Sequence, residues 1–257
     1  MASTTSLPLD IVKDIMQHLW LSPLSIVDRA NVIKTGHLVS KRWTHLFCDI
    51  ESKDAYIISP SHAKTFIYLL QGATYLSRTG YYTHDRLCRS ITFQHARDTV
   101  FPSPALHTEL PMIYSMNNVL YHISHSASSP FELPHLRKIS VELENYLMES
   151  FFIPNTFRFF PLQVTDLELD FRYSADIPPS LLRAIRAVPT GRRYPAPIRG
   201  SLPNISRLRV MGSSGDGVRV MAQACSSMDW TKVEQDALRT STQIGTGDTA
   251  WLVNHGY

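Results

Sequence analysis

The strongest constraint on the fold is a spacing pattern that recurs after residue 87. An apolar residue is followed by two residues of any type, an apolar residue, any residue and a further apolar residue. The pattern occurs five times, as Cys88-Ile91-Phe93, Met116-Val119-Tyr121, Leu136-Ile139-Val141, Val164-Leu167-Leu169 and Ile205-Leu208-Val210. Because successive side chains of a strand point to opposite faces, the last two apolar residues of each occurrence share one face. The pattern therefore predicts a series of half-buried strands that pack on a common core.

The distances between the five occurrences indicate a repeat. The steps between their first residues are 28, 20, 28 and 41 residues, and three of these fall within the range of about 20 to 29 residues that is typical of leucine-rich repeats. The region thus resembles a degenerate leucine-rich-repeat array. This resemblance implies a short, irregular solenoid of strands and helices with one concave strand face that binds other proteins. An α/β or α+β domain without solenoid order is the alternative, because the Asn or Cys that usually follows each strand is absent.

The segments around these strands have their own signals. Residues 56–58 form a short apolar run that predicts a further strand, and helical periodicity marks 62–76, 179–188 and 218–224. Four prolines and two glycines lie within 189–203. This composition predicts an irregular insertion, which explains the one long step of 41 residues.

Three short helices are predicted in the first 52 residues. Pro8 suits a first helical position, and Asp10 complements the positive end of the helix dipole. Ser22-Pro23 predicts the start of the second helix, and Gly36 predicts its end in a left-handed conformation. The apolar residues of the first and third helices recur at helical spacing, at Ile11, Val12, Ile15, Met16 and Leu19 and at Val39, Trp43, Leu46, Phe47 and Ile50. A module of this size buries only a small core, so surplus apolar surface is expected.

Two stretches of this module resemble an F-box. They are Leu7-Pro8-Leu9-Asp10-Ile11 and, further on, Leu38-Val39-Ser40-Lys41-Arg42-Trp43 with Leu46. The intervening segment, 20–37, is longer than the usual F-box middle and resembles the F-box-like proteins of mushroom-type fungi. The resemblance implies binding to the Skp-type adaptor of a cullin-RING ubiquitin ligase. The adaptor-binding residues that it implies are Leu7, Pro8, Ile11, Ile15, Leu19, Leu38, Val39 and Trp43.

The expected organisation is therefore an F-box-like helical module at 1–52, a leucine-rich-repeat-like interaction domain at 53–225 and a C-terminal tail at 226–257. The repeat pattern does not continue into the tail. Residues beyond about Thr240 are expected to be mobile, which leaves an open sheet edge and a wall shorter than a full horseshoe, as a truncated gene model would produce. The alternative is that Trp251 and Leu252 fold back as a cap on that edge.

Composition excludes several classes of function. The formal net charge is only +3 and the basic residues are scattered, so neither nucleic-acid binding nor anionic-membrane binding is expected. Three cysteines occur, and their wide separations fit neither a zinc site nor a disulfide framework. Residues 1–9 have neither the basic region nor the apolar region that is typical of a signal peptide, and no run of eighteen apolar residues is present. An intracellular protein, cytoplasmic or nuclear, is expected.

The sequence offers no candidate catalytic, cofactor-binding or metal-binding residues. His122-x-x-His125 is the one close histidine pair, and a pair on the surface explains it better than a metal site. The glycines of 212–217 match no phosphate-binding motif, and a turn that needs positive φ explains them better. Glu168 and Asp170 are expected on the outward side of their strand.

The expected function is that of a non-catalytic adaptor. The module would dock the Skp-type subunit, and the repeat-like domain would carry an unknown target protein to the ligase. The alternative is a divergent protein-binding scaffold in which the module is only a structural cap. The two hypotheses differ in one observable, because the adaptor hypothesis requires that Leu7, Pro8, Ile11, Ile15 and Trp43 are not covered by the second domain.

Overall fold

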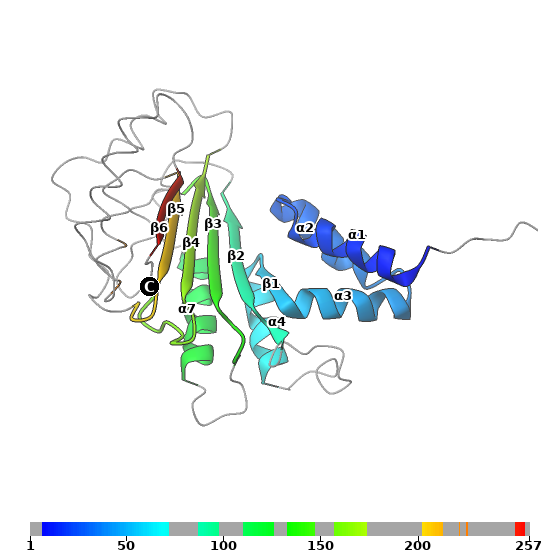
Figure 1. The fold of residues 1–257 in the computed structure, drawn as a ribbon, viewed down its shortest axis with the longest axis horizontal. Coiled ribbons are helices and arrows are strands. Elements are labelled where there is room, and N and C mark those ends of the chain that lie inside the picture. Colours follow the sequence, from blue (N-terminus) through cyan, green and yellow to red (C-terminus); the bar gives the residue numbers. More distant parts are fainter. Residues whose placement is uncertain are drawn as a thin grey trace, which may run out of the picture.

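The protein has a mixed α/β fold, which is described here from a computed structural model. The structure describes residues 7–71, 87–97, 110–125, 133–146, 157–173, 202–212, 221, 225 and 250–254. Within these ranges five helices accompany one six-stranded sheet. Figure 1 shows the N-terminal helices beside the first strands, and the later helices against the sheet. The expected helices at 179–188 and 218–224 lie outside the described ranges, apart from Met221.

The strands follow one another across the sheet in chain order. The first five strands are parallel, which is the order that a repeating strand-and-return path produces. They are β1 (Asp54–Ile57), β2 (Ser90–Ala96), β3 (Lys138–Glu144), β4 (Asp166–Arg172) and β5 (Arg207–Met211). The strand predictions at 56–58, 88–93, 136–141, 164–169 and 205–210 are therefore confirmed. The α/β class is confirmed with them.

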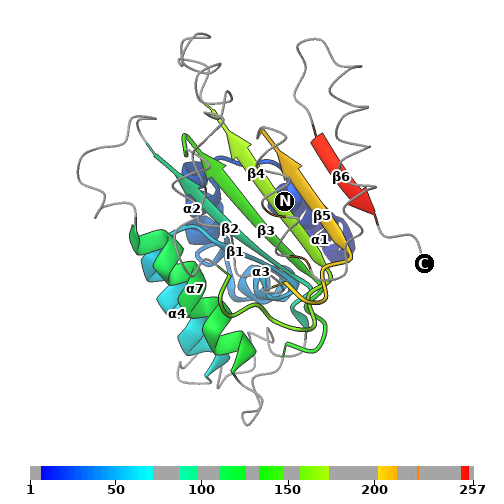
Figure 2. The same cartoon turned by 90° about the vertical axis from the view of Figure 1, so that its left-hand side faces the viewer.

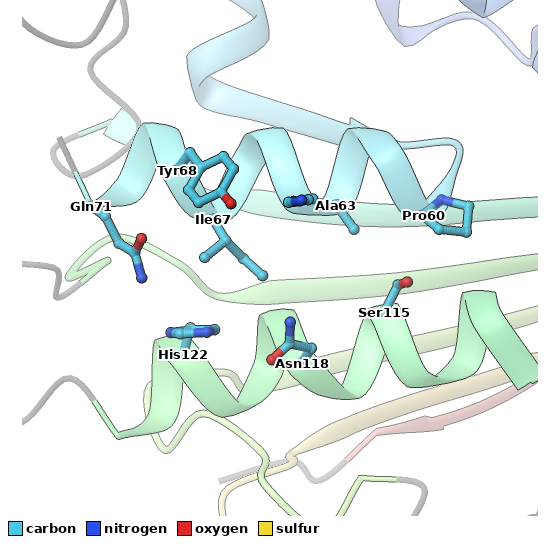
Figure 3. A pocket seen from close by; sticks show the side chains of 9 residues that line it. Pro60, Ala63, Ile67, Tyr68, Gln71, Ser115, Asn118 and His122 are labelled. Atoms are coloured by element: carbon cyan, nitrogen blue, oxygen red, sulfur yellow. The ribbon is translucent and has the colours of Figure 1, made fainter. Parts of the chain in front are cut away.

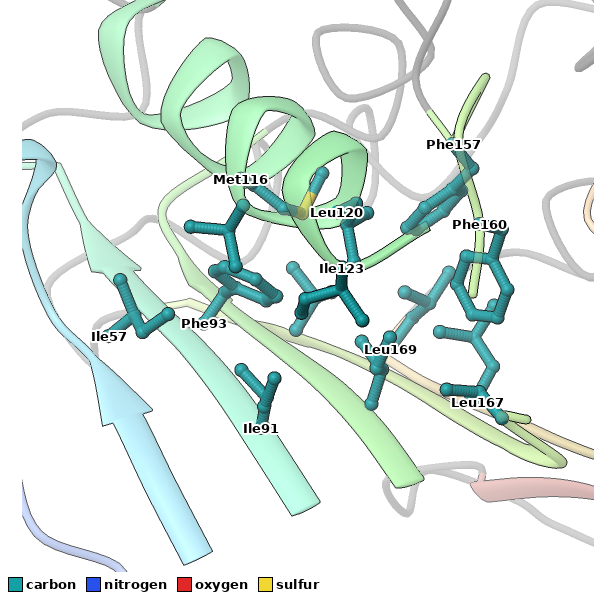
Figure 4. Packing of buried hydrophobic residues seen from close by; sticks show 14 of the residues in the cluster. Ile57, Ile91, Phe93, Met116, Leu120, Ile123, Phe157, Phe160, Leu167 and Leu169 are labelled. Atoms are coloured by element: carbon teal, nitrogen blue, oxygen red, sulfur yellow. The ribbon is translucent and has the colours of Figure 1, made fainter. Parts of the chain in front are cut away.

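One face of the sheet is apolar. In register, Ile91, Ile139, Leu167 and Leu208 lie side by side on this face. Helices α4 (Pro60–Leu70) and α7 (Leu110–Ser124) pack on it (Figure 2) and enclose the main core. Figure 4 shows Met116, Leu120 and Ile123 of α7 directed at the side chains of the strands. Because alternate residues of each strand point away from this core, the opposite face carries the polar side chains.

The prediction of a strand at Met116-Val119-Tyr121 was wrong, because these residues lie in α7. The spacing that suggested a strand is only part of a longer helical pattern. The buried residues of this helix recur at offsets of one, three and four, at Met112, Ile113, Met116, Val119, Leu120 and Ile123. A short window of this sequence fits both periods, and the longer apolar run decides in favour of the helix.

The three predicted N-terminal helices are present as α1 (Leu9–Leu21), α2 (Ile26–Gly36) and α3 (Lys41–Lys53). Pro8 precedes the first helical residue instead of occupying it. Ser25, and not Ser22, caps α2, because its hydroxyl accepts a hydrogen bond from the Asp28 amide at 3.1 Å.

The prediction of a left-handed end at Gly36 was also wrong, because Gly36 is the last residue of α2. A Cβ atom there would lie 3.0 Å from the Phe47 ring, so this glycine allows α2 and α3 to approach closely. Gly212, by contrast, has a φ of +69°, which agrees with the expectation of a turn after β5.

The edge of the sheet after β5 is not open. Residues 250–254 form β6 (Ala250–Asn254), which pairs antiparallel with β5. The expectation that the tail leaves this edge unpaired was therefore wrong, and the alternative in which Trp251 and Leu252 return to the sheet is correct. None of the helices in the described ranges has the length and apolar character to cross a membrane.

Candidate protein-binding surface

The helical module has a small core of its own. Its buried members are Met16, Trp20, Phe47 and Ile50. The Trp20 ring makes edge-to-face contacts with Phe47 and Tyr56, with ring centroids 5.2 and 5.1 Å apart. Val12, Met16 and Trp20, which are four residues apart along α1, direct one side of this helix into the core. The module therefore does not need the outer side of α1 for its own packing.

The outer side of α1 is nevertheless apolar. Ile11, Ile15 and Leu19, again four residues apart, keep 46%, 55% and 44% of their surface exposed. Leu7, just before the helix, is 64% exposed. Together these four residues are called the outer stripe. An apolar row of this length on a monomer is typical of a surface that binds another protein.

The structure brings most of the residues implied by the F-box resemblance to the surface. Leu38 and Val39 are exposed in the turn between α2 and α3. Figure 1 shows that α1 and α3 both begin at the end of the module that lies farthest from the sheet, so this turn and Leu7 occupy the same end. Trp43 is the exception, because it is half-buried and packs against the module core.

No described residue of the sheet domain covers the outer stripe. The condition that separates the adaptor hypothesis from the cap hypothesis is met for Leu7, Pro8, Ile11 and Ile15. The candidate residues chosen from the sequence omitted three further exposed apolar residues, Leu9 and Leu21 in α1 and Val27 in α2. Each lies outside the helical row that was used as the signal.

Arg29 joins the module to the sheet, and its contacts with both are called the joint. Its side chain is only 1% exposed, and its guanidinium donates hydrogen bonds to the carbonyl oxygens of Trp20 at 2.6 Å and Ser22 at 2.9 Å. It also donates to Oε1 of Gln94 in β2 at 3.2 Å and lies 3.4 Å from the centroid of the Tyr56 ring. Burial lowers the pKa of Arg29 from its ordinary value, but an arginine stays charged in proteins.

Gln94, which belongs to this joint, makes two further hydrogen bonds, one to the module and one to the sheet. Its Nε2 donates to the Leu24 carbonyl at 2.9 Å and to Oε2 of Glu142 in β3 at 3.2 Å. Trp20 Nε1 adds a hydrogen bond to the Asp54 carbonyl at 2.7 Å, where α3 runs directly into β1. The α1–α2 loop is therefore held on the polar face of the sheet, with no linker between module and sheet.

The rest of the polar face carries a network of ion pairs across the strands. Glu168 of β4 contacts Lys138 of β3 at 2.6 Å and Arg209 of β5 at 3.0 Å. Asp166 of β4 contacts Arg207 at 3.0 Å. The carboxylates of Glu168 and Asp166 are largely buried, whereas their basic partners are 43% to 60% exposed. A partner that approaches this face therefore meets the positively charged groups first. Glu168 lies on the outward side of its strand, as expected. Asp170 lies on the same side but is only 8% exposed, and it accepts a hydrogen bond from Arg172 at 2.6 Å.

Among the described residues, no group of three His, Cys, Asp or Glu side chains is placed to hold a metal ion. Burial raises the pKa of Cys88 and of Cys225 to about 12, and a buried thiol of that kind is a poor nucleophile. His125 stacks on Tyr121 with centroids 4.2 Å apart.

His37 gives the module a pH-dependent contact. Contacts with the Cys48 sulfur and with the Glu51 carboxylate, whose Oε2 lies 3.6 Å from His37 Nε2, raise the pKa of His37 to about 9. Because the folded state holds the proton more tightly than the unfolded state, this contact stabilises the module fully below a pH of about 6.5. The contribution is lost as the pH rises through 9.

The free energy of unfolding is therefore expected to fall by about 2 kcal/mol between pH 6 and pH 9.5 through this group, a figure reduced for the 28% of the His37 side chain that water reaches. Urea denaturation of the chain and of a His37→Gln variant measures the difference. The variant is expected to lose less stability over the same range. Equal pH dependence in both proteins would contradict the assignment.

The comparisons with known proteins give no neighbour. No family model, no curated protein and no solved structure matches this chain.

Proposed function

We propose that this chain is a non-catalytic substrate-recognition adaptor of a Skp-cullin-F-box type ubiquitin ligase. The outer stripe of α1, with Leu38 and Val39, docks the Skp-type subunit. The sheet domain binds the target protein. One observation carries the proposal: the outer stripe is apolar and exposed although the core of the module is complete without it.

The joint at Arg29 supports this role. An adaptor without catalytic residues acts by holding its target close to the enzyme, so the gain depends on effective concentration and on geometry. Arg29 and Gln94 tie the module to the polar face of the sheet through buried hydrogen bonds. A target on the sheet domain is then presented at a fixed angle to the subunit bound by α1.

Gel filtration of the purified chain with a purified Skp-type adaptor tests the proposal. A one-to-one complex that elutes ahead of either protein is expected. If the two proteins elute separately at micromolar concentrations, the chain is not an adaptor of this ligase.

The second candidate is a protein-binding scaffold in which the module is a structural cap. The direct run of α3 into β1 and the hydrogen bond from Trp20 to Asp54 favour it, because they make the module a continuous extension of the first strand. A scaffold of this kind would bind no Skp-type adaptor, so the same gel filtration separates the two candidates.

A further inference from the structure

A groove lies between α4 and α7, on the side of these helices that faces away from the sheet. Its volume is about 410 Å³, which is within the range of sites that bind ligands. Figure 3 shows side chains of the two helices facing each other across it, with Pro60 and Ser115 at one end and Gln71 and His122 at the other. The groove is separate from the outer stripe, so what it binds does not depend on the proposed adaptor role.

The helix on one side of this groove has an unusual surface. The fifteen residues of α7 include no Asp, Glu, Lys or Arg, whereas a solvated helix face normally carries charged residues. Tyr114 and Tyr121 are 58% and 41% exposed on it, and Tyr68 of α4 is 43% exposed nearby. Depletion of charge with enrichment in tyrosine is typical of the core of a protein interface and not of free surface.

The lining indicates what the groove binds. Ala63 and Ile67 form an apolar floor. The side-chain amides of Gln71 and Asn118 stand on opposite walls, and an amide both donates and accepts, as a peptide main chain requires. Among the described lining residues the only formal charge is that of Lys64, and none carries a carboxylate.

These features fit an extended peptide better than a helix. The main chain of an extended segment has free N–H and C=O groups that can bond to the amides of Gln71 and Asn118, whereas the main chain of a helix is already bonded within the helix. The span from Pro60 to Gln71 is about 16 Å at the rise of an α-helix, enough for about five extended residues. The surplus positive charge of Lys64 then favours an acidic side chain within that segment.

We propose that the groove between α4 and α7 binds an extended segment of about five residues from a partner protein, with one acidic side chain at Lys64. The amides of Gln71 and Asn118 bond the main chain of the segment. Tyr68, which lines the groove, contacts a residue next to the acidic side chain.

An array of hexapeptides tests this proposal with the full chain. Each peptide with one central Asp or Glu is paired with its Asn or Gln analogue. We expect a set of acidic peptides to bind, and the amide analogues to bind roughly tenfold more weakly or worse, because they lose a charge-assisted contact with Lys64.

Three variants complete the test. Lys64→Gln is expected to remove the preference for the acidic peptides, and Asn118→Ala is expected to weaken both members of each pair. Lys34→Gln, on the exposed side of α2, is the matched control and is expected to change nothing. Circular dichroism confirms that each variant is folded. If no peptide binds, or if folded Lys64→Gln and Asn118→Ala variants bind as the unchanged chain does, the proposal is wrong.

Discussion

Alanine at both Ile11 and Ile15 is expected to weaken the complex with a Skp-type adaptor by at least about thirtyfold. A buried anchor of an interface typically contributes about 2 kcal/mol or more, which equals about thirtyfold in affinity for one site. The two residues lie one turn apart on α1 and are half exposed in the free chain. Their truncation therefore removes interface contacts without opening a cavity in the module. Fluorescence anisotropy of a labelled adaptor measures the loss.

Tyr114→Ala, on the distant outer side of α7, is the matched control for this experiment, because it also truncates a large exposed residue. It is expected to leave adaptor affinity unchanged. Trp43 is a poor choice for such a test, since it packs on the module core and its loss would destabilise the fold. A folded Ile11→Ala/Ile15→Ala chain that binds as tightly as the unchanged chain would show that the outer stripe is not the docking surface.

The second large effect is expected at Arg29. Replacement by Met should lower the free energy of unfolding by about 3 kcal/mol, because breaking a buried charged network leaves its partners without donors. The carbonyl oxygens of Trp20 and Ser22 and the side chain of Gln94 would lose their hydrogen bonds in a buried site. The contact with the Tyr56 ring would be lost as well. Guanidinium denaturation measures the change.

Lys34→Met provides the control, since it changes the same charge on the exposed side of the same helix. Its effect is expected to remain within about 0.5 kcal/mol, as for other surface substitutions. Hydrogen exchange adds a second measurement. In Arg29→Met the amides of α1 and α2 are expected to exchange faster than those of β3 and β4. That difference would show that the module opens while the sheet stays folded. Equal losses of stability in the two variants would show that Arg29 does not hold the joint.

The sequence predicts the strands well because apolar and polar residues alternate along each one, which places the apolar residues on one buried face. Ile91 and Phe93, or Leu167 and Leu169, are local signals that need no knowledge of the neighbouring strands. The same signal failed at Met116, because three apolar residues in six fit a helix and a strand equally well. The start of α2 was misplaced for a related reason: Ser22 and Ser25 both suit a cap, and the local sequence does not show which hydroxyl meets a free amide.

The candidate surface could be predicted only in part. The row of Ile11, Ile15 and Leu19 is visible in the sequence, but its exposure is not, because Val12 and Met16 form an equally apolar row that faces the core. The joint at Arg29 left no signal at all. Its partner Gln94 lies 65 residues further along the chain. An arginine within a short helix is usually exposed to solvent, so its sequence position does not predict a buried contact. The groove between α4 and α7 was missed because part of α7 was assigned to a strand.

A calorimetric titration of the full chain with a purified Skp-type adaptor, at several temperatures, tests the adaptor proposal most directly. Burial of the outer stripe predicts one-to-one binding with a negative change in heat capacity, which is the reliable mark of apolar burial. Substitution of Ile11 and Ile15 by Ala should abolish most of that signal. Absence of binding heat at every temperature, together with separate elution of the two proteins, would contradict the proposal.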